Sequence, residues 1–219
     1  IFFIAAAAAE VAPNDVNIAT GPAVPAAQGT VIVAGGFTAG TSPTQDGRIF
    51  RDGIPSTCPS KAYPGLFAAG TIFHFEQFEL VNNAAAPVCA TINFNPDTPA
   101  AGNACNVNAH ISAYIGSYDP ANQAANFVGD VGSSVTQPFS FEVPANSSVI
   151  LVVSTTNGAD PLANCNFEFS FNPAEYLYLL AGPHATAAVN TDFVDDGLAA
   201  FALALFIVGL VTLRKRAER

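Results

Sequence analysis

Residues 88–94 have the sequence VCATINF, and their polarity alternates from one residue to the next. The even-numbered positions hold Val, Ala, Ile and Phe, whereas the odd-numbered positions hold Cys, Thr and Asn. Successive side chains of a β-strand point to opposite faces. The run therefore predicts a strand with one apolar face.

The same alternation recurs on both sides of this run, at residues 109–115, 139–143 and 167–171. Val149-Ile150-Leu151-Val152-Val153 is apolar throughout, which is typical of a strand that is buried on both faces. Residues 71–80 are also strand-like, but their apolar phase changes between Phe75 and Phe78. We expect a β-bulge near Glu76-Gln77 at that point.

Turn-forming residues separate these runs, for example Asn95-Pro96-Asp97 and Asn157-Gly158. With two further candidate strands, at residues 31–33 and 176–180, the pattern predicts an all-β fold, an antiparallel β-sandwich of about eight strands. We assign the sandwich to residues 48–180. Residues 10–47 are poor in charge and rich in Ala, Gly, Pro and Thr, so we expect a loop-rich, extended segment there.

Several stretches of this region resemble a recurring bacterial extracellular β-sandwich module. The resemblance spans residues 48–172 and rests on RIFRDGIPSTC (48–58), FHFEQF (73–78), VCATI (88–92), AYIGSYDP (113–120), NFVGD (126–130) and FSFEVP (139–144). Such modules are similar in topology to pre-peptidase C-terminal domains and occur in large secreted or surface proteins. The resemblance implies a location outside the cytoplasm and no catalytic residues.

The two ends of the chain are apolar. The chain contains no Met, so we expect Ile1 not to be the translation start. Residues 1–9 have the composition of the end of a signal peptide, with small residues before Glu10; the alternative is the end of a second membrane helix. Residues 181–196 form a predicted linker that ends in the acidic cluster Asp192, Asp195 and Asp196.

Residues 197–213 carry no charge over 17 positions, which predicts a transmembrane helix at the short end of the usual range. Its anchoring side chains would be Leu198, Phe201, Leu203, Leu205, Phe206, Ile207, Leu210 and Leu213. The basic tail at 214–219, with Arg214, Lys215 and Arg216, places the C-terminus in the cytoplasm by the positive-inside rule. A buried core helix is the alternative, but the charged flanks disfavour it. The layout resembles that of PEP-CTERM-type tails.

Between Glu10 and Asp196 there are sixteen acidic and three basic side chains, a net charge of −13. This balance excludes binding of nucleic acid through its phosphates. The four cysteines Cys58, Cys89, Cys105 and Cys165 form an even set in an exported chain, so we expect two disulfides. Three pairings are open. The hypothesis we prefer joins Cys89 to Cys105 across one hairpin, which leaves Cys58 to Cys165.

The sequence contains few residues in patterns that are typical of catalytic or metal sites. His74, His110 and His184 are far apart, and no hydrolase, zinc or phosphate-loop motif is present, so we expect no enzyme. Asp119, Asn122, Asn126 and Asp130 offer oxygen ligands for calcium in one predicted loop, although Asp and Asn also favour turns. We expect no other cofactor.

The sequence is consistent with three functions. The first is a non-enzymatic membrane-anchored protein with a structural, adhesive or assembly role at the cell surface. The second is a carbohydrate- or calcium-binding module, with Tyr114 and Tyr118 exposed beside the 119–130 loop. The third is an accessory subunit of an integral membrane complex, in which Phe201, Leu203, Leu205 and Phe206 pack on partner helices. In each case lipid and protein are the expected partners.

Overall fold

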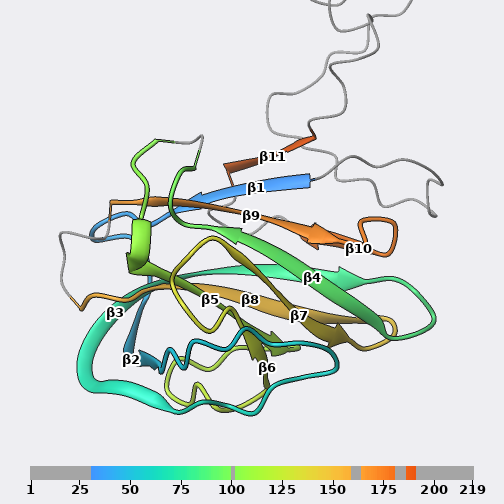
Figure 1. Cartoon of the computed structure of the whole chain (residues 1–219), viewed down its shortest axis with the longest axis horizontal. Coiled ribbons are helices and arrows are strands. Elements are labelled where there is room, and N and C mark those ends of the chain that lie inside the picture. The colour runs from blue at the N-terminus through green and yellow to red at the C-terminus, as the bar shows by residue number, and fades with distance from the viewer. Residues whose placement is uncertain (1–30, 100–101, 159–163, 181–185, 191–219) are drawn as a thin grey trace, which may run out of the picture.

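The computed structural model describes residues 31–99, 102–158, 164–180 and 186–190, and these residues form two antiparallel sheets packed face to face (Figure 1). The all-β sandwich predicted from the sequence is confirmed. The first sheet has five strands, in the spatial order β11 (Thr186–Asn190), β1 (Val31–Gly36), β9 (Asn166–Asn172), β4 (Val88–Asn95) and β7 (Gln137–Val143).

The second sheet has six strands. Five follow the order β10 (Leu177–Leu180), β3 (Leu66–Asn82), β8 (Ser147–Thr155), β5 (Ala109–Ile115) and β6 (Phe127–Asp130), and β2 (Thr44–Ile49) also pairs with β3. A short 3₁₀ helix, η1 (Asn106–Asn108), leads into β5.

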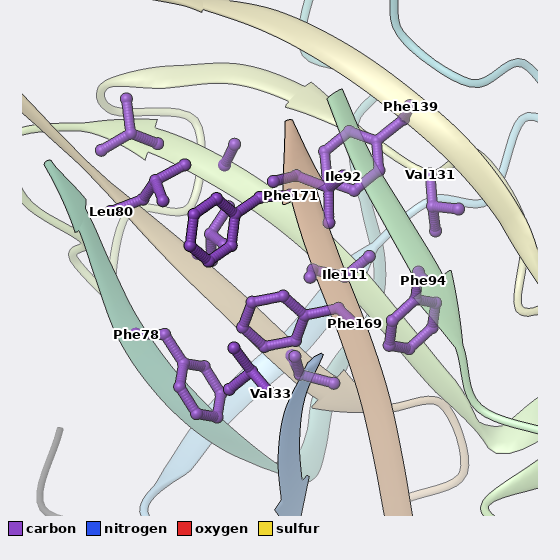
Figure 2. Packing of buried hydrophobic residues seen from close by; sticks show 14 of the residues in the cluster. Val33, Phe78, Leu80, Ile92, Phe94, Ile111, Val131, Phe139, Phe169 and Phe171 are labelled. Carbon is purple, nitrogen blue, oxygen red and sulfur yellow. The ribbon is translucent and has the colours of Figure 1, made fainter. Parts of the chain in front are cut away.

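The core lies between the sheets and consists mainly of the alternating apolar residues that the sequence analysis identified. Figure 2 shows Phe94, Phe169 and Phe171 of the first sheet packed with Phe78 and Leu80 of the second. All five side chains are almost fully buried. Burying such a side chain contributes about 1.5–3 kcal/mol on transfer from water, so this layer is a major source of stability.

Strand β3 does change its buried face, but without the predicted bulge. Its pairing with β8 runs without interruption from Phe75 to Asn82. Phe78 and Leu80 point into the sandwich, whereas Phe75 belongs to a second apolar cluster. A regular strand needs no bulge when both of its faces are covered at different points along its length.

Three strands were not expected. The Asp46-Gly47 turn signal lies inside β2, where Gly47 adopts a φ of 69° and the register with β3 shifts. Between the pairs Asp46–Ile72 and Arg48–Phe67, β2 has one residue and β3 has four, so the extra residues lie in β3. β6 lies within the predicted 119–130 loop, and β11 lies within the predicted 181–196 linker. The sandwich also includes β1 and most of β2, from the segment predicted to be loop-rich.

An Ω loop, residues 50–65, closes one side of the sandwich. Its ends meet where the Phe50 N–H donates to the Gly65 carbonyl. Between them the loop bonds to both sheets: the Ser56 N–H donates to the carbonyl of Asp130, the last residue of β6, and the Ser140 N–H of β7 donates to the Ser56 carbonyl. In Figure 1 this segment runs from β2 past β6 and back to β3. The Ω loop therefore joins the edges of the two sheets.

The cysteines form two disulfides, but the preferred pairing was wrong. Cys58 of the Ω loop is bonded to Cys89 of β4, and Cys105 is bonded to Cys165. Cys89 is exposed on the outer face of its sheet, whereas Cys105 is buried at the edge of the core. The two side chains that we had paired therefore lie on different faces.

Within the described residues no helix is long and apolar enough to cross a membrane. The predicted span at 197–213, the basic tail at 214–219 and the apolar segment at 1–9 all lie outside those residues.

The pairing can be tested by digesting the unreduced protein with a protease that cleaves before aspartate. Cys58 and Cys89 share fragment 52–96, whereas Cys105 and Cys165 lie in fragments 97–118 and 160–191. We expect mass spectrometry to find the last two fragments joined by a disulfide and to find an internal disulfide in 52–96. A disulfide between 52–96 and either of the others would contradict the structure.

Candidate functional site

The outer face of the six-stranded sheet is covered rather than exposed to solvent. Ile49, Phe75, Tyr114 and Val152 form a buried apolar cluster there. Tyr63 of the Ω loop, Tyr118, Phe127 and Ile150 pack against it. The Tyr114 and Tyr118 ring centroids are only 4.6 Å apart. A sheet covered on both faces can bury polar side chains on its second face, and the candidate site lies on this covered face.

Tyr114 and Tyr118 do not form the exposed aromatic pair that the sequence analysis expected. Tyr114 is fully buried, and its pKa is raised well above the usual range by desolvation. The Tyr118 hydroxyl donates to Gln45 Oε1 at 2.6 Å, and burial also raises its pKa. Both rings therefore serve packing beneath the 118–126 loop rather than stacking on a ligand.

Lys61 lies at the centre of the polar part of this face. Its ammonium donates to Asp52 Oδ1 at 2.7 Å, to Asp130 Oδ1 at 2.9 Å and to the Ile54 carbonyl at 2.6 Å. The Asp130 side chain is 0% exposed, and that of Lys61 is 13% exposed. The pair thus joins the Ω loop to β6 by charge-assisted hydrogen bonds in a place with little water.

The other two Lys or Arg residues of the described chain, Arg48 and Arg51, also lie in or beside the Ω loop. Arg48 is buried, stacks over the Phe67 ring at 4.2 Å and donates to the Thr156 and Ile49 carbonyls. Desolvation, with a contribution from Arg51, lowers the pKa of Arg48 to about 10. Arg51 donates to the Val107 carbonyl and to Ser134. Each cation is thus held by internal contacts.

His110 of β5 points to this covered face, opposite to its neighbours Ala109 and Ile111 in the core. It is 1% exposed, and its Nε2 has no hydrogen-bond partner within the described part of the chain. Desolvation, followed by the charges of Arg48, Arg51 and Lys61, lowers its pKa to about 3. His110 is therefore neutral and out of reach of substrates. His74 lies on the non-adjacent strand β3, and His184 lies outside the described residues.

A small pocket of about 160 Å³ opens beside this face, between the 118–124 loop and the start of β3. Its polar lining comes from Asp46, Tyr63, Asn122 and Gln123. The Gln123 amide donates to the Asp46 and Gly47 carbonyls, whereas its Oε1 is buried and has no partner among the described residues. Because this oxygen is buried, the polar groups that the pocket presents to solvent belong to exposed residues such as Asp46 and Asn122.

The four residues proposed for calcium are not brought together as one ligand set. Asp130 points beneath the Ω loop to Lys61 and also accepts the Gly132 N–H. Asp119 is exposed and accepts the Ala121 N–H, and the Asn126 amide donates to Ser117. Asn122 lines the pocket. Among the described residues, no three His, Cys, Asp or Glu side chains are grouped to hold a metal.

The sequence analysis missed Lys61, Asp52 and the burial of His110. One signal was available: Lys61 is one of only three basic residues between Glu10 and Asp196, and it lies in the same loop as Asp52. Their partner Asp130 is distant in sequence, and only the tertiary fold brings it to them.

His110 should make stability depend on pH in a known direction. An unfolded histidine has a pKa near 6.5, whereas that of folded His110 is about 3. Between these values only the unfolded state binds the proton, so the free energy of unfolding decreases as the pH falls through this window. From pH 7 to pH 5 the loss due to His110 is about 2 kcal/mol.

Chemical denaturation of the wild type and of His110→Gln at both pH values measures this effect. The variant should lose less stability than the wild type by about that amount. Asn93→Gln, at an exposed position on β4 that does not titrate, is the control and should keep the wild-type dependence. Equal pH dependence in the wild type and His110→Gln would show that His110 is not buried in the neutral form.

Comparison of the chain with protein-family models, with curated proteins and with solved structures gave no match. The function must therefore be argued from the residues themselves.

Proposed function

We propose that this chain is a non-enzymatic extracytoplasmic protein whose β-sandwich has a structural, adhesive or assembly role at the cell surface, anchored by the segment 197–213. The observation that carries the proposal is that all four cysteines are paired in disulfides. Disulfides persist in oxidising compartments and are rare in the cytosol. The resemblance to bacterial extracellular modules agrees with this location.

The covered face supports a role without catalysis. Its polar side chains hold the Ω loop in place, and His110 is neutral and buried. In contrast, Phe50 and Phe67 are large exposed side chains whose ring centroids lie 6.3 Å apart, and Ile54 nearby in the Ω loop is 63% exposed. Exposed apolar groups of this kind are typical of surfaces that contact other proteins.

Native purification of the full chain from membranes in mild detergent tests this role. We expect one or more protein partners at a fixed ratio, and we expect Phe50→Ser combined with Ile54→Ser to remove them. Tyr178→Ser changes an exposed side chain on β10, which pairs with the opposite end of β3 from Phe67, and should leave them bound. Free thiols in the native chain would refute the extracytoplasmic location. Partners lost only on changing Phe201 and Phe206 would favour an accessory membrane subunit.

A second candidate is ligand binding at the 118–124 pocket, because the exposed residues Asp46 and Asn122 give its lining polar groups that a ligand can reach. The volume of about 160 Å³ is below that of usual ligand sites. The pocket therefore suits only part of a ligand, such as one sugar ring of a larger carbohydrate. Calcium belongs to this candidate only if it uses ligands other than Asp130.

Calorimetry of the full chain with a panel of monosaccharides and with calcium tests the second candidate. A sugar that binds here should lose affinity about tenfold or more in Asn122→Ala, which corresponds to the loss of one hydrogen bond of about 1.4 kcal/mol. Asn93→Ala changes an exposed asparagine on β4 and serves as the control. No heat from any compound would exclude this function.

A further inference from the structure

The Lys61 amine and the Asp130 carboxyl are held against each other in a nearly dry place. Lys61 Nζ lies 2.9 Å from Asp130 Oδ1, and the Asp130 side chain is 0% exposed. The backbone holds both groups in position: Lys61 N–H donates to the Val128 carbonyl, and Ser56 N–H donates to the Asp130 carbonyl. Fixed contact of this kind supplies the proximity that a reaction between two groups requires.

The two oxygens of Asp130 differ in their surroundings. Oδ1 accepts both the Lys61 amine and the Gly132 N–H, the latter at 2.7 Å. Oδ2 is buried and has no partner within the described residues. Desolvation raises the pKa of this carboxyl, despite the hydrogen bond from Lys61. A raised pKa means that this carboxyl takes up a proton more readily than an ordinary aspartate. In the protonated form Oδ1 is the polarised carbonyl oxygen and Oδ2 is the hydroxyl.

Asp52 supplies a second carboxylate at the same amine. Its Oδ1 lies 2.7 Å from Lys61 Nζ and also accepts the Ile54 N–H. Desolvation raises the pKa of Asp52, but hydrogen bonds from Lys61 and Ile54 outweigh it, so the net shift is downward. The Asp52 side chain is 23% exposed, which leaves a path to solvent. An ionised carboxylate in contact with an amine can take its proton.

We propose that Lys61 and Asp130 form an intramolecular amide bond, with Asp52 as the catalytic residue that transfers the proton. Asp52 takes one proton from the Lys61 ammonium, and the resulting amine attacks Cγ of the protonated Asp130 carboxyl. A C–N bond forms while the Gly132 N–H stabilises charge on Oδ1. The C–Oδ2 bond then breaks: Asp52 gives its proton to the departing hydroxyl, which leaves as water, and Asp52 then takes the remaining extra proton from the nitrogen. No oxidant, reductant or cofactor is required.

The bond would tie the Ω loop covalently to β6, while Cys58–Cys89 ties the same loop to β4. The inference is independent of the proposed function, because it needs neither a partner nor a ligand. It depends only on three side chains of this chain.

The test is mass spectrometry of the full purified chain after denaturation, reduction and alkylation. We expect an intact mass lower than that of the sequence by one water. Trypsin gives the location of the bond, because Arg51 and Lys61 flank fragment 52–61, and no Lys or Arg follows until Arg214. Once Lys61 is acylated trypsin cannot cleave there, so fragment 52–61 should stay attached to the rest.

Two variants distinguish the bond from simple contact. Lys61→Arg keeps the positive charge and the donors but forms no such amide, so it should show the full sequence mass. Asp52→Ala should slow bond formation by about 100-fold or more, the usual contribution of a general acid–base group. Alanine is preferred to asparagine, because Asn followed by Gly53 deamidates back to aspartate. Circular dichroism and intact disulfides would show that both variants fold.

A wild-type chain that has its full mass and releases fragment 52–61 would overturn the proposal. A chain that has lost one water but still releases fragment 52–61 would also overturn it, because a succinimide at Asp46-Gly47 or Asp52-Gly53 loses the same mass and leaves Lys61 cleavable. If Asp52→Ala forms the bond at the wild-type rate, the role of Asp52 is wrong.

Discussion

The contact of Lys61 with two carboxylates is the interaction on which the closed side of the sandwich depends. Two sheets packed face to face leave their edges open unless a further segment covers them. Here the Ω loop fills that position, and its one ammonium reaches from the loop to Asp130 of β6. Before any amide forms between them, removing one partner of such a buried ion pair costs about 3–5 kcal/mol, because the other charge is left without compensation.

Coverage of the second sheet on both faces also explains why several expectations about the site were wrong. An antiparallel sheet commonly has one solvated face, and the expectation that Tyr114 and Tyr118 are exposed followed that rule. The Ω loop and the 118–126 loop cover this face instead. The same side chains then become a second core, with Tyr114 packed on Tyr118 and His110 held neutral.

Alternation was enough to predict the central strands, because it is a local property of the chain. It could not predict β2, whose sequence TQDGRI has one apolar residue and a glycine where the register with β3 shifts. β2 is a strand because β3 is long enough to pair with it beyond the end of the core. The predicted disulfide pairing was wrong for a related reason. Cys89 contacts Cys58 only because the Ω loop runs along β7, and no residue near Cys89 in the sequence indicates that course of the chain.

The distribution of charge over the described residues follows from the way the Ω loop covers the edges of the two sheets. Arg48, Arg51 and Lys61 are the three basic residues between Glu10 and Asp196, and each is engaged in internal contacts in or beside the Ω loop. The acidic side chains of that region are far more numerous, and many of them, such as Asp119 and Glu142, are exposed. The described surface is therefore acidic, because its three Lys and Arg side chains make internal contacts that stabilise the fold. A surface of this kind repels polyanions and stays soluble, so contact with a partner must come from exposed apolar groups or from a partner that is itself basic.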